Sequence, residues 1–167
     1  MSKVSMIDHL IEIIFRNIPA NKIGSLLKDL SCNGQKIINQ NFTCDCPEMD
    51  WSTETSIERI FLENSNFGVF INLKDLTRRN VYLPNCGIAI YKNENTINLE
   101  INFQLLDLKD VPIKDLTKNL MELAKSIAVQ YQIDDYFGGL EPAQDIETRL
   151  FTNDSVLFSS KANLFKR

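Results

Sequence analysis

The side chains that most often perform acid–base and nucleophilic catalysis are scarce in this sequence. Its 167 residues include one histidine, His9, so a serine or cysteine nucleophile has a single histidine to activate it. The sequence also lacks a phosphate-binding glycine loop and the patterns G-x-G-x-x-G, G-x-S-x-G and H-E-x-x-H. Because these patterns carry the chemistry of many hydrolases and nucleotide-dependent enzymes, we predict no catalytic residues. Carboxylate-only catalysis stays open, since two acidic side chains can hydrolyse a glycoside.

The cysteines do not have the spacing of a metal centre. They stand at positions 32, 44, 46 and 86, and the close pair Cys44 and Cys46 has one residue between them. Structural zinc sites use two pairs with wider C-x₂₋₄-C spacing. Because no export signal precedes them, reduced thiols are expected rather than disulfides. The sequence predicts neither a metal nor a cofactor.

Negative charge is concentrated towards the C-terminal end of the sequence. Residues 93–154 contain twelve acidic and five basic side chains, and residues 134–154 contain six acids and one base, Arg149. Aromatic residues are interspersed among these carboxylates, and the pair Gly138–Gly139 predicts a tight turn directly after Tyr136 and Phe137. Opposite charges speed encounter with a basic protein, and buried aromatic rings supply much of the binding energy. The predicted partner-binding residues of this region are Asp134, Asp135, Tyr136, Phe137, Glu141, Asp145 and Glu147.

A second candidate cluster surrounds the single tryptophan. Asp50 and Trp51 lie in an acidic stretch, and tryptophan is a frequent interface anchor. For both clusters a structural interpretation remains open, in which the carboxylates are solvated and the rings belong to the hydrophobic core.

Charge and hydropathy exclude several classes of protein. The net charge is −4, whereas nucleic-acid binding needs a surplus of Lys and Arg on some surface. No stretch approaches 18 consecutive apolar residues, so no membrane span is predicted. The N-terminal apolar stretch is interrupted by charged residues and is not followed by a cleavage site, which predicts a cytoplasmic protein.

The elements that must position these side chains follow from hydrophobic periodicity. Residues 96–103 alternate strictly, as in a half-buried antiparallel strand. Helical spacing is found in residues 20–30 and in a longer segment that begins after Pro112. Short apolar runs predict further strands at residues 10–15, 57–62, 69–73 and 88–91. We therefore predict one domain over residues 1–167, of the α+β class, with an antiparallel sheet of about five strands covered on one face by two helices.

These features resemble those of the immunity proteins of bacterial toxin–immunity systems, such as contact-dependent growth inhibition. The resemblance rests on the small acidic chain, the missing catalytic motifs, the Asn- and Ile-rich composition and the segment Tyr136–Pro142. It implies a stoichiometric inhibitor that binds a cognate toxin domain one to one. Many such toxins are nucleases with basic clefts, so the expected partner is a basic protein, with no direct contact to nucleic acid.

Two other functions remain open from the sequence. A carboxylate-based enzyme or a small-ligand-binding domain would need a deep pocket with at least one strongly perturbed acid. An adaptor or secretion chaperone would share the surface chemistry of an immunity protein, so the sequence does not separate these two possibilities.

Overall fold

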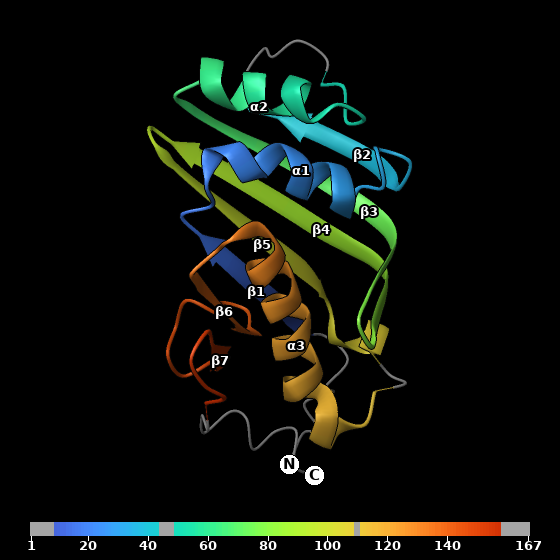
Figure 1. Ribbon diagram of the computed structural model, residues 1–167. Coiled ribbons are helices and arrows are strands. Elements are labelled where there is room, and N and C mark those ends of the chain that lie inside the picture. Colours follow the sequence, from blue (N-terminus) through green and yellow to red (C-terminus); the bar gives the residue numbers. More distant parts are fainter. Residues whose placement is uncertain (1–8, 44–48, 109–110, 158–167) are drawn as a thin grey trace.

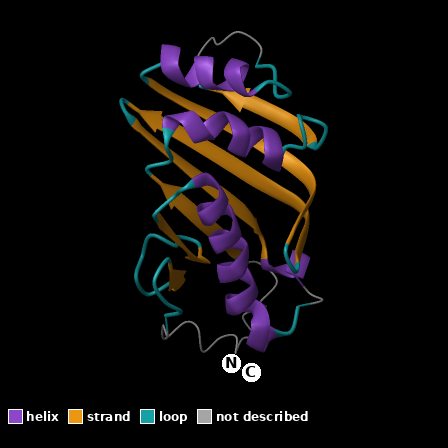
Figure 2. Cartoon of the chain, viewed as in Figure 1, coloured by secondary structure: helices purple, strands orange, loops and turns teal. Residues whose placement is uncertain are grey.

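The computed structural model describes residues 9–43, 49–108 and 111–157, which form one antiparallel sheet with helices on one side (Figures 1 and 2). The elements are β1 (Leu10–Arg16), α1 (Ala20–Leu30), β2 (Ile37–Phe42), α2 (Glu54–Glu63), β3 (Asn66–Arg78), β4 (Val81–Asn93), β5 (Thr96–Gln104), the 3-10 turn η2 (Leu105–Leu108), α3 (Ile113–Tyr131), β6 (Asp135–Leu140) and β7 (Arg149–Thr152). The strand order is β2-β3-β4-β5-β1-β6-β7, and each neighbouring pair is antiparallel.

The hydrophobic core lies between the three helices and the sheet face that they cover. The helices α1 and α3 contribute side chains at helical spacing, and the strands contribute every second residue. Strand β5 shows this alternation most clearly, because Ile97, Leu99, Ile101 and Phe103 are all buried while the residues between them are partly exposed. Full burial of one such side chain stabilises the fold by about 1.5–3 kcal/mol.

The prediction of about five strands covered by two helices is wrong, because the described residues contain seven strands and three α-helices. Residues 57–62 were expected as a strand and belong to α2. Their buried side chains, Ile57, Ile60 and Phe61, have the i, i+3, i+4 spacing of a helix face, whereas Leu62 is 72% exposed. The strand prediction for this short apolar run is therefore wrong, because the run has the period of a helix.

The additional strands lie in segments with little hydrophobic periodicity. Strand β2 lies within residues 31–55, and it is an edge strand with mostly exposed side chains, so it has little hydrophobic pattern. Strand β6 lies in the acidic C-terminal region, where a tight turn was expected at Gly138–Gly139. These two glycines lie instead inside a paired strand.

The glycines allow β6 and β7 to approach closely. A Cβ atom on Gly139 would lie 2.3 Å from the carbonyl oxygen of Thr148, and one on Gly138 would lie 2.5 Å from the ring of Phe151. Real Cβ atoms do not come so close to backbone atoms, so a side chain at Gly139 would push the β7 side of the sheet away.

Among the residues that the structure describes, no helix is long and apolar enough to cross a membrane.

Candidate partner-binding surfaces

The structure buries both aromatic rings of the predicted acidic surface. Tyr136 and Phe137 are consecutive residues of β6, so they point to opposite faces of the sheet, and they are 5% and 3% exposed. The ring of Tyr136 lies 6.1 Å from that of Phe15, and burial raises the pKa of the Tyr136 hydroxyl. Phe137 lies under two guanidinium groups, Arg16 at 4.7 Å and Arg149 at 4.1 Å. Both rings are engaged in contacts within the chain, so anchoring a partner would require this packing to change.

The carboxylates of the same region form two groups. Asp134 is exposed and Asp135 partly exposed at the start of β6, whereas Glu141, Asp145 and Glu147 are exposed in the loop that follows it. A strand of six residues spans about 20 Å, so β6 separates the two groups by roughly this distance. The predicted cluster is thus extended along one side of the sheet.

Asp50 and Trp51 have structural contacts in the fold. The carboxylate of Asp50 accepts hydrogen bonds from the Ser52 amide and from the hydroxyls of Ser52 and Thr53, which together hold its pKa below the usual range. Trp51 is 8% exposed, and its indole Nε1 donates to Gln40 at 2.7 Å.

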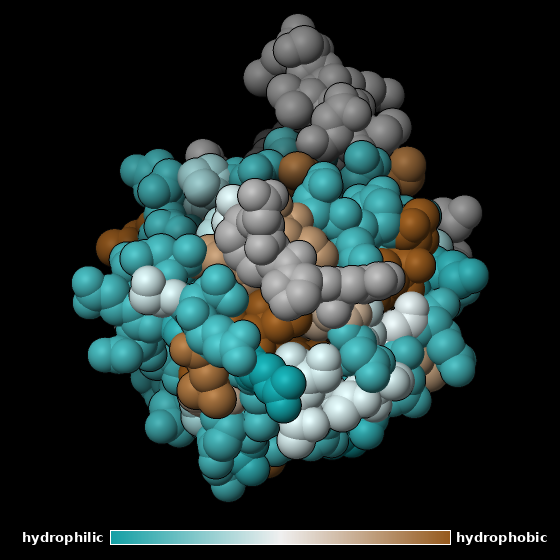
Figure 3. Space-filling model, turned by 90° about the horizontal axis from the view of Figure 1, so that it is seen from above, coloured by the Kyte–Doolittle hydropathy of each residue, from teal (hydrophilic) through white to brown (hydrophobic). Residues whose placement is uncertain are grey.

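The end of the molecule that carries α2 is mainly hydrophilic at its surface, with separate hydrophobic patches (Figure 3).

A second group of carboxylates was missed at the sequence level. In the register of the sheet, Glu12 on β1 pairs with Asn102 on β5, and paired residues point to the same face. Glu100 precedes Asn102 by two residues on β5, so its side chain points to this face as well. Both carboxylates therefore lie on the face opposite the helices. Glu12 is 8% exposed and accepts a hydrogen bond from the Ala143 amide at 2.9 Å. Burial raises the pKa of Glu100, and the negative charges of Glu12 and Glu141 raise it further.

The sequence contained one sign of this arrangement. Glu12 interrupts the apolar run of residues 10–15, and an acid in such a position is usually hydrogen-bonded. Its neighbour Glu100 follows 88 positions later in the sequence, so only the strand register could bring the two together.

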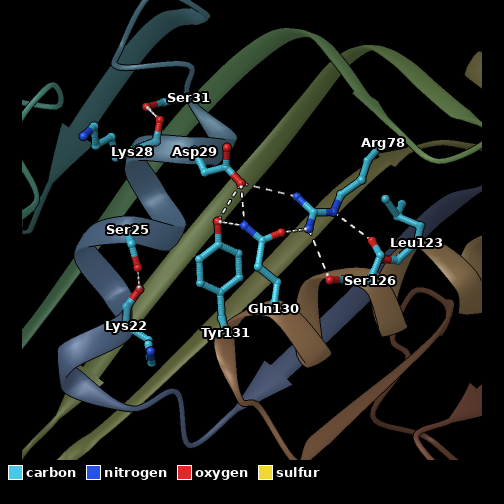
Figure 4. Close-up of polar contacts among 10 residues, drawn as sticks. All are labelled: Lys22, Ser25, Lys28, Asp29, Ser31, Arg78, Leu123, Ser126, Gln130 and Tyr131. Atoms are coloured by element: carbon cyan, nitrogen blue, oxygen red, sulfur yellow. Dashed lines mark hydrogen bonds and ion pairs between the residues drawn. The ribbon is translucent and has the colours of Figure 1, made fainter.

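A polar network connects α1, α3 and the end of β3 (Figure 4). Asp29 accepts hydrogen bonds from the Tyr131 hydroxyl at 2.6 Å, from Gln130 at 3.3 Å and from Arg78 at 3.4 Å. The guanidinium of Arg78 also donates to the hydroxyl of Ser126 at 2.7 Å and to the Gln130 side chain. Burial, followed by the hydrogen bond to Asp29, raises the pKa of Tyr131. Every group of this network has a partner within the chain, so its main effect is to fix the helices relative to the sheet.

The hollow beside this network does not have the features of a catalytic site. It measures about 480 Å³, is open to solvent, and is lined by side chains of both charges, including Lys22, Lys28, Asp29 and Glu54. No three metal-binding side chains are grouped within the ranges that the structure describes. Cys86 is buried, which raises its pKa to about 12, and Cys32 is exposed, while Cys44 and Cys46 lie outside the described residues.

Comparison with known proteins identifies a matching family of immunity proteins. A family model described as "PABL017 Cdi1I immunity protein" matches residues 9–156. Among solved structures, the chain matches one from a crystal structure of the toxic C-terminal tip of CdiA from Pseudomonas aeruginosa in complex with immune protein. That match has a TM-score of 0.74 and 23% sequence identity, and covers 89% of this chain and 97% of the other. No match was found among curated proteins.

The fold and the matched family define a bacterial immunity protein, and the resemblance predicted from the sequence is confirmed. Because the family model covers most of the sequence, the chain belongs to the PABL017 Cdi1I immunity protein family.

Proposed function

We propose that this protein is a cytoplasmic inhibitor of a cognate CdiA-type toxin domain, which it neutralises by forming a one-to-one complex. The observation that carries the proposal is the family match over residues 9–156. The fold is shared with a chain from a complex of a CdiA toxin tip with its immune protein, which supports the same type of partner.

The chemistry of the surface supports a basic toxin, and we propose a nuclease. The chain has a net charge of −4, and exposed acids lie at both ends of β6. An acidic protein surface attracts a cleft that is built to bind phosphates, and the attraction raises the rate of association. In this proposal Asp134, Asp135, Glu141, Asp145 and Glu147 steer the toxin towards the immunity protein.

Co-expression in bacteria tests the proposed function directly. We expect that a neighbouring gene encodes the toxin domain. This toxin domain is induced with and without the immunity protein, and an unrelated immunity protein of similar size and charge serves as the control. We expect rescue of growth by this protein alone, and a purified complex with one copy of each chain. Growth arrest that continues in the presence of the immunity protein would show that the proposal is wrong.

The type of toxin is tested separately. Purified toxin domain is incubated with RNA and DNA, with increasing amounts of the immunity protein. Cleavage that stops at an equimolar ratio is the expected result. If the growth assay shows that the toxin is cognate but the toxin cleaves neither RNA nor DNA, the proposal of a nuclease is refuted. The proposal of a toxin inhibitor then still stands.

A further inference from the structure

The sheet has a second face, opposite the three helices, which we call the rear face. The helices all lie on one side of the sheet (Figures 1 and 2). Near β6 the rear face is covered by the chain itself, where Ile14, Phe137 and Ala143 form a small buried cluster. Over β2, β3, β4 and β5 its side chains are exposed or partly exposed, with Ala89 as the buried exception. We call this part the open half of the rear face.

The strand register places the side chains of the open half in two adjoining rows that cross the sheet. The first row consists of Asn41, Phe70, Ala89 and Glu100, and the second row consists of Asn39, Asn72, Gly87 and Asn102. Each row continues onto β1, the first to Ile14 and the second to Glu12. The open half therefore changes from aromatic and amide side chains at one end to carboxylates at the other.

The aromatic end has the composition of a protein interface. Phe70 is 38% exposed and Tyr91 is 45% exposed, and their rings meet edge to face with centres 5.5 Å apart. The small residues Ala89 and Gly87 leave a hollow of about 160 Å³ beside Phe70 that is bordered by amide side chains. A second hollow of about 540 Å³ adjoins Gly87 on the other side, away from the two rings, and is also bordered by amides. Exposed rings beside small residues, with hydrogen-bonding groups around them, are typical of the anchors of a protein–protein contact.

Among the described residues, no Lys or Arg side chain forms an ion pair at the carboxylate end, and the rear-face guanidinium groups of Arg16 and Arg149 lie over Phe137 instead. The two ion pairs among the described residues join Lys28 to Glu54 and Arg78 to Asp29, and neither involves the rear face. Glu12 is almost fully buried, and the pKa of Glu100 is raised by its own burial and then by the charge of Glu12. Two partly desolvated carboxylates repel each other, so a cation from outside the chain would be bound strongly there.

The size of the open half suits a macromolecular partner. Eight residues of β3, β4 and β5 extend about 26 Å and the six residues of β2 about 20 Å, which at the usual strand spacing of about 4.8 Å gives roughly 470 Å² for the sheet surface alone. A standard interface buries about 800 Å² on each partner. The open half can therefore supply the larger share of one interface, with the acids near β6 at its edge.

We propose that the open half of the rear face is the surface on which the toxin docks, with a Lys or Arg side chain of the toxin bound at Glu100 beside Glu12 and an apolar part of the toxin packed on Phe70 and Tyr91. This inference rests on the proposed function and adds the location of the interface. The exposed acids near β6 then steer a toxin that the rear face holds.

The test measures the dissociation constant of the toxin domain with the full-length wild-type chain and with variants of the rear face. Glu100→Gln is expected to weaken binding at least about thirtyfold, the change that corresponds to loss of one side of a buried charge pair. Tyr91→Ala and Phe70→Ala are expected to weaken it at least about tenfold, as for aromatic anchors. The matched controls on the exposed side of α3, Glu122→Gln and Val129→Ala, should stay within about twofold of the wild type.

A footprint of the wild-type protein keeps the test independent of folding in the variants. Oxidation by hydroxyl radicals should modify Phe70 and Tyr91 in the free chain, and the toxin should protect both. Leu62, which is 72% exposed on α2 and so lies on the helix side of the sheet, is an internal standard for labelling.

Three results would overturn the inference. If the wild type binds the toxin while all three rear-face variants keep its affinity and the footprint is unchanged, the interface lies elsewhere, and the proposed function still stands. If the free chain is a dimer that the rear-face variants dissociate without a loss of toxin affinity, the surface joins two copies of the chain. If the wild type neither binds nor rescues, the proposed function fails together with the inference.

Discussion

Replacing Glu100 with glutamine should make the free protein more stable at neutral pH. Burial raises the pKa of Glu100 above its ordinary value of 4.5, and the charge of Glu12 raises it further. An acid whose pKa is higher in the folded than in the unfolded chain favours the folded state below pH 4.5, and this contribution is lost as the pH rises through the folded-state pKa. Glutamine has the same shape and does not ionise, so the variant avoids the loss.

The size of the effect follows from the register of the sheet. Glu12 and Glu100 occupy diagonal positions on neighbouring antiparallel strands, and the repulsion of such a cross-strand pair costs up to about 1 kcal/mol. For a chain of this length, 1 kcal/mol changes Tm by about 2–4 °C. We therefore expect Glu100→Gln to raise Tm by about 1–4 °C at pH 7, and to change it little near pH 4.

Thermal unfolding followed by circular dichroism, between about pH 4 and pH 7, measures this difference for the wild type and the variant. Glu122→Gln on α3 controls for the loss of one negative charge. A Glu100→Gln variant that is less stable than the wild type at pH 7, or whose advantage does not grow with pH, would refute the reasoning. Because the same substitution is expected to weaken toxin binding, the carboxylate would serve binding at the expense of stability.

Three further predictions follow from contacts within the fold and from its charges. Gly139→Ala should lower the free energy of unfolding by about 2 kcal/mol or more in urea denaturation, since the new methyl group would lie 2.3 Å from the Thr148 carbonyl oxygen; an unchanged midpoint would contradict this. Arg78→Met should cost about 1–3 kcal/mol in the same assay, because it leaves polar groups between α1 and α3 without their donor, and full stability would mean that the network is dispensable. Reversing the charge of Asp134 and Asp135 to lysine should slow toxin association, most at low salt; association rates that keep their value and salt dependence would remove these acids from the steering role.

Periodic segments were the part of the fold that the sequence could predict. The alternation over Thr96–Phe103 indicates a strand, and β5 covers it. The helical spacing over residues 20–30 and after Pro112 indicates two helices, which are α1 and α3. Short runs such as residues 57–62 could not be assigned in this way, because six residues are too few to distinguish the period of a helix from the period of a strand.

The candidate site was harder to predict than the fold, because acidity alone does not distinguish surface from interior. Tyr136 and Phe137 lie among acids in the sequence, yet β6 is an inner strand, so both rings are buried. The carboxylates of Glu12 and Glu100 share one face only through the pairing of β1 with β5. Whether the acids near β6 contact a partner stays a prediction.

The position of β1 inside the sheet, between β5 and β6, has a consequence for the synthesis of this protein. Strand β1, the first among the residues that the structure describes, pairs with β5 on one side and with β6 on the other, so its partners leave the ribosome some 80 to 130 residues later. Strands β2 to β5 are neighbours in order and can assemble while translation continues. The sheet closes around β1 only when β6 has emerged, so a nascent chain that stops before residue 135 is expected to give the cell no protection.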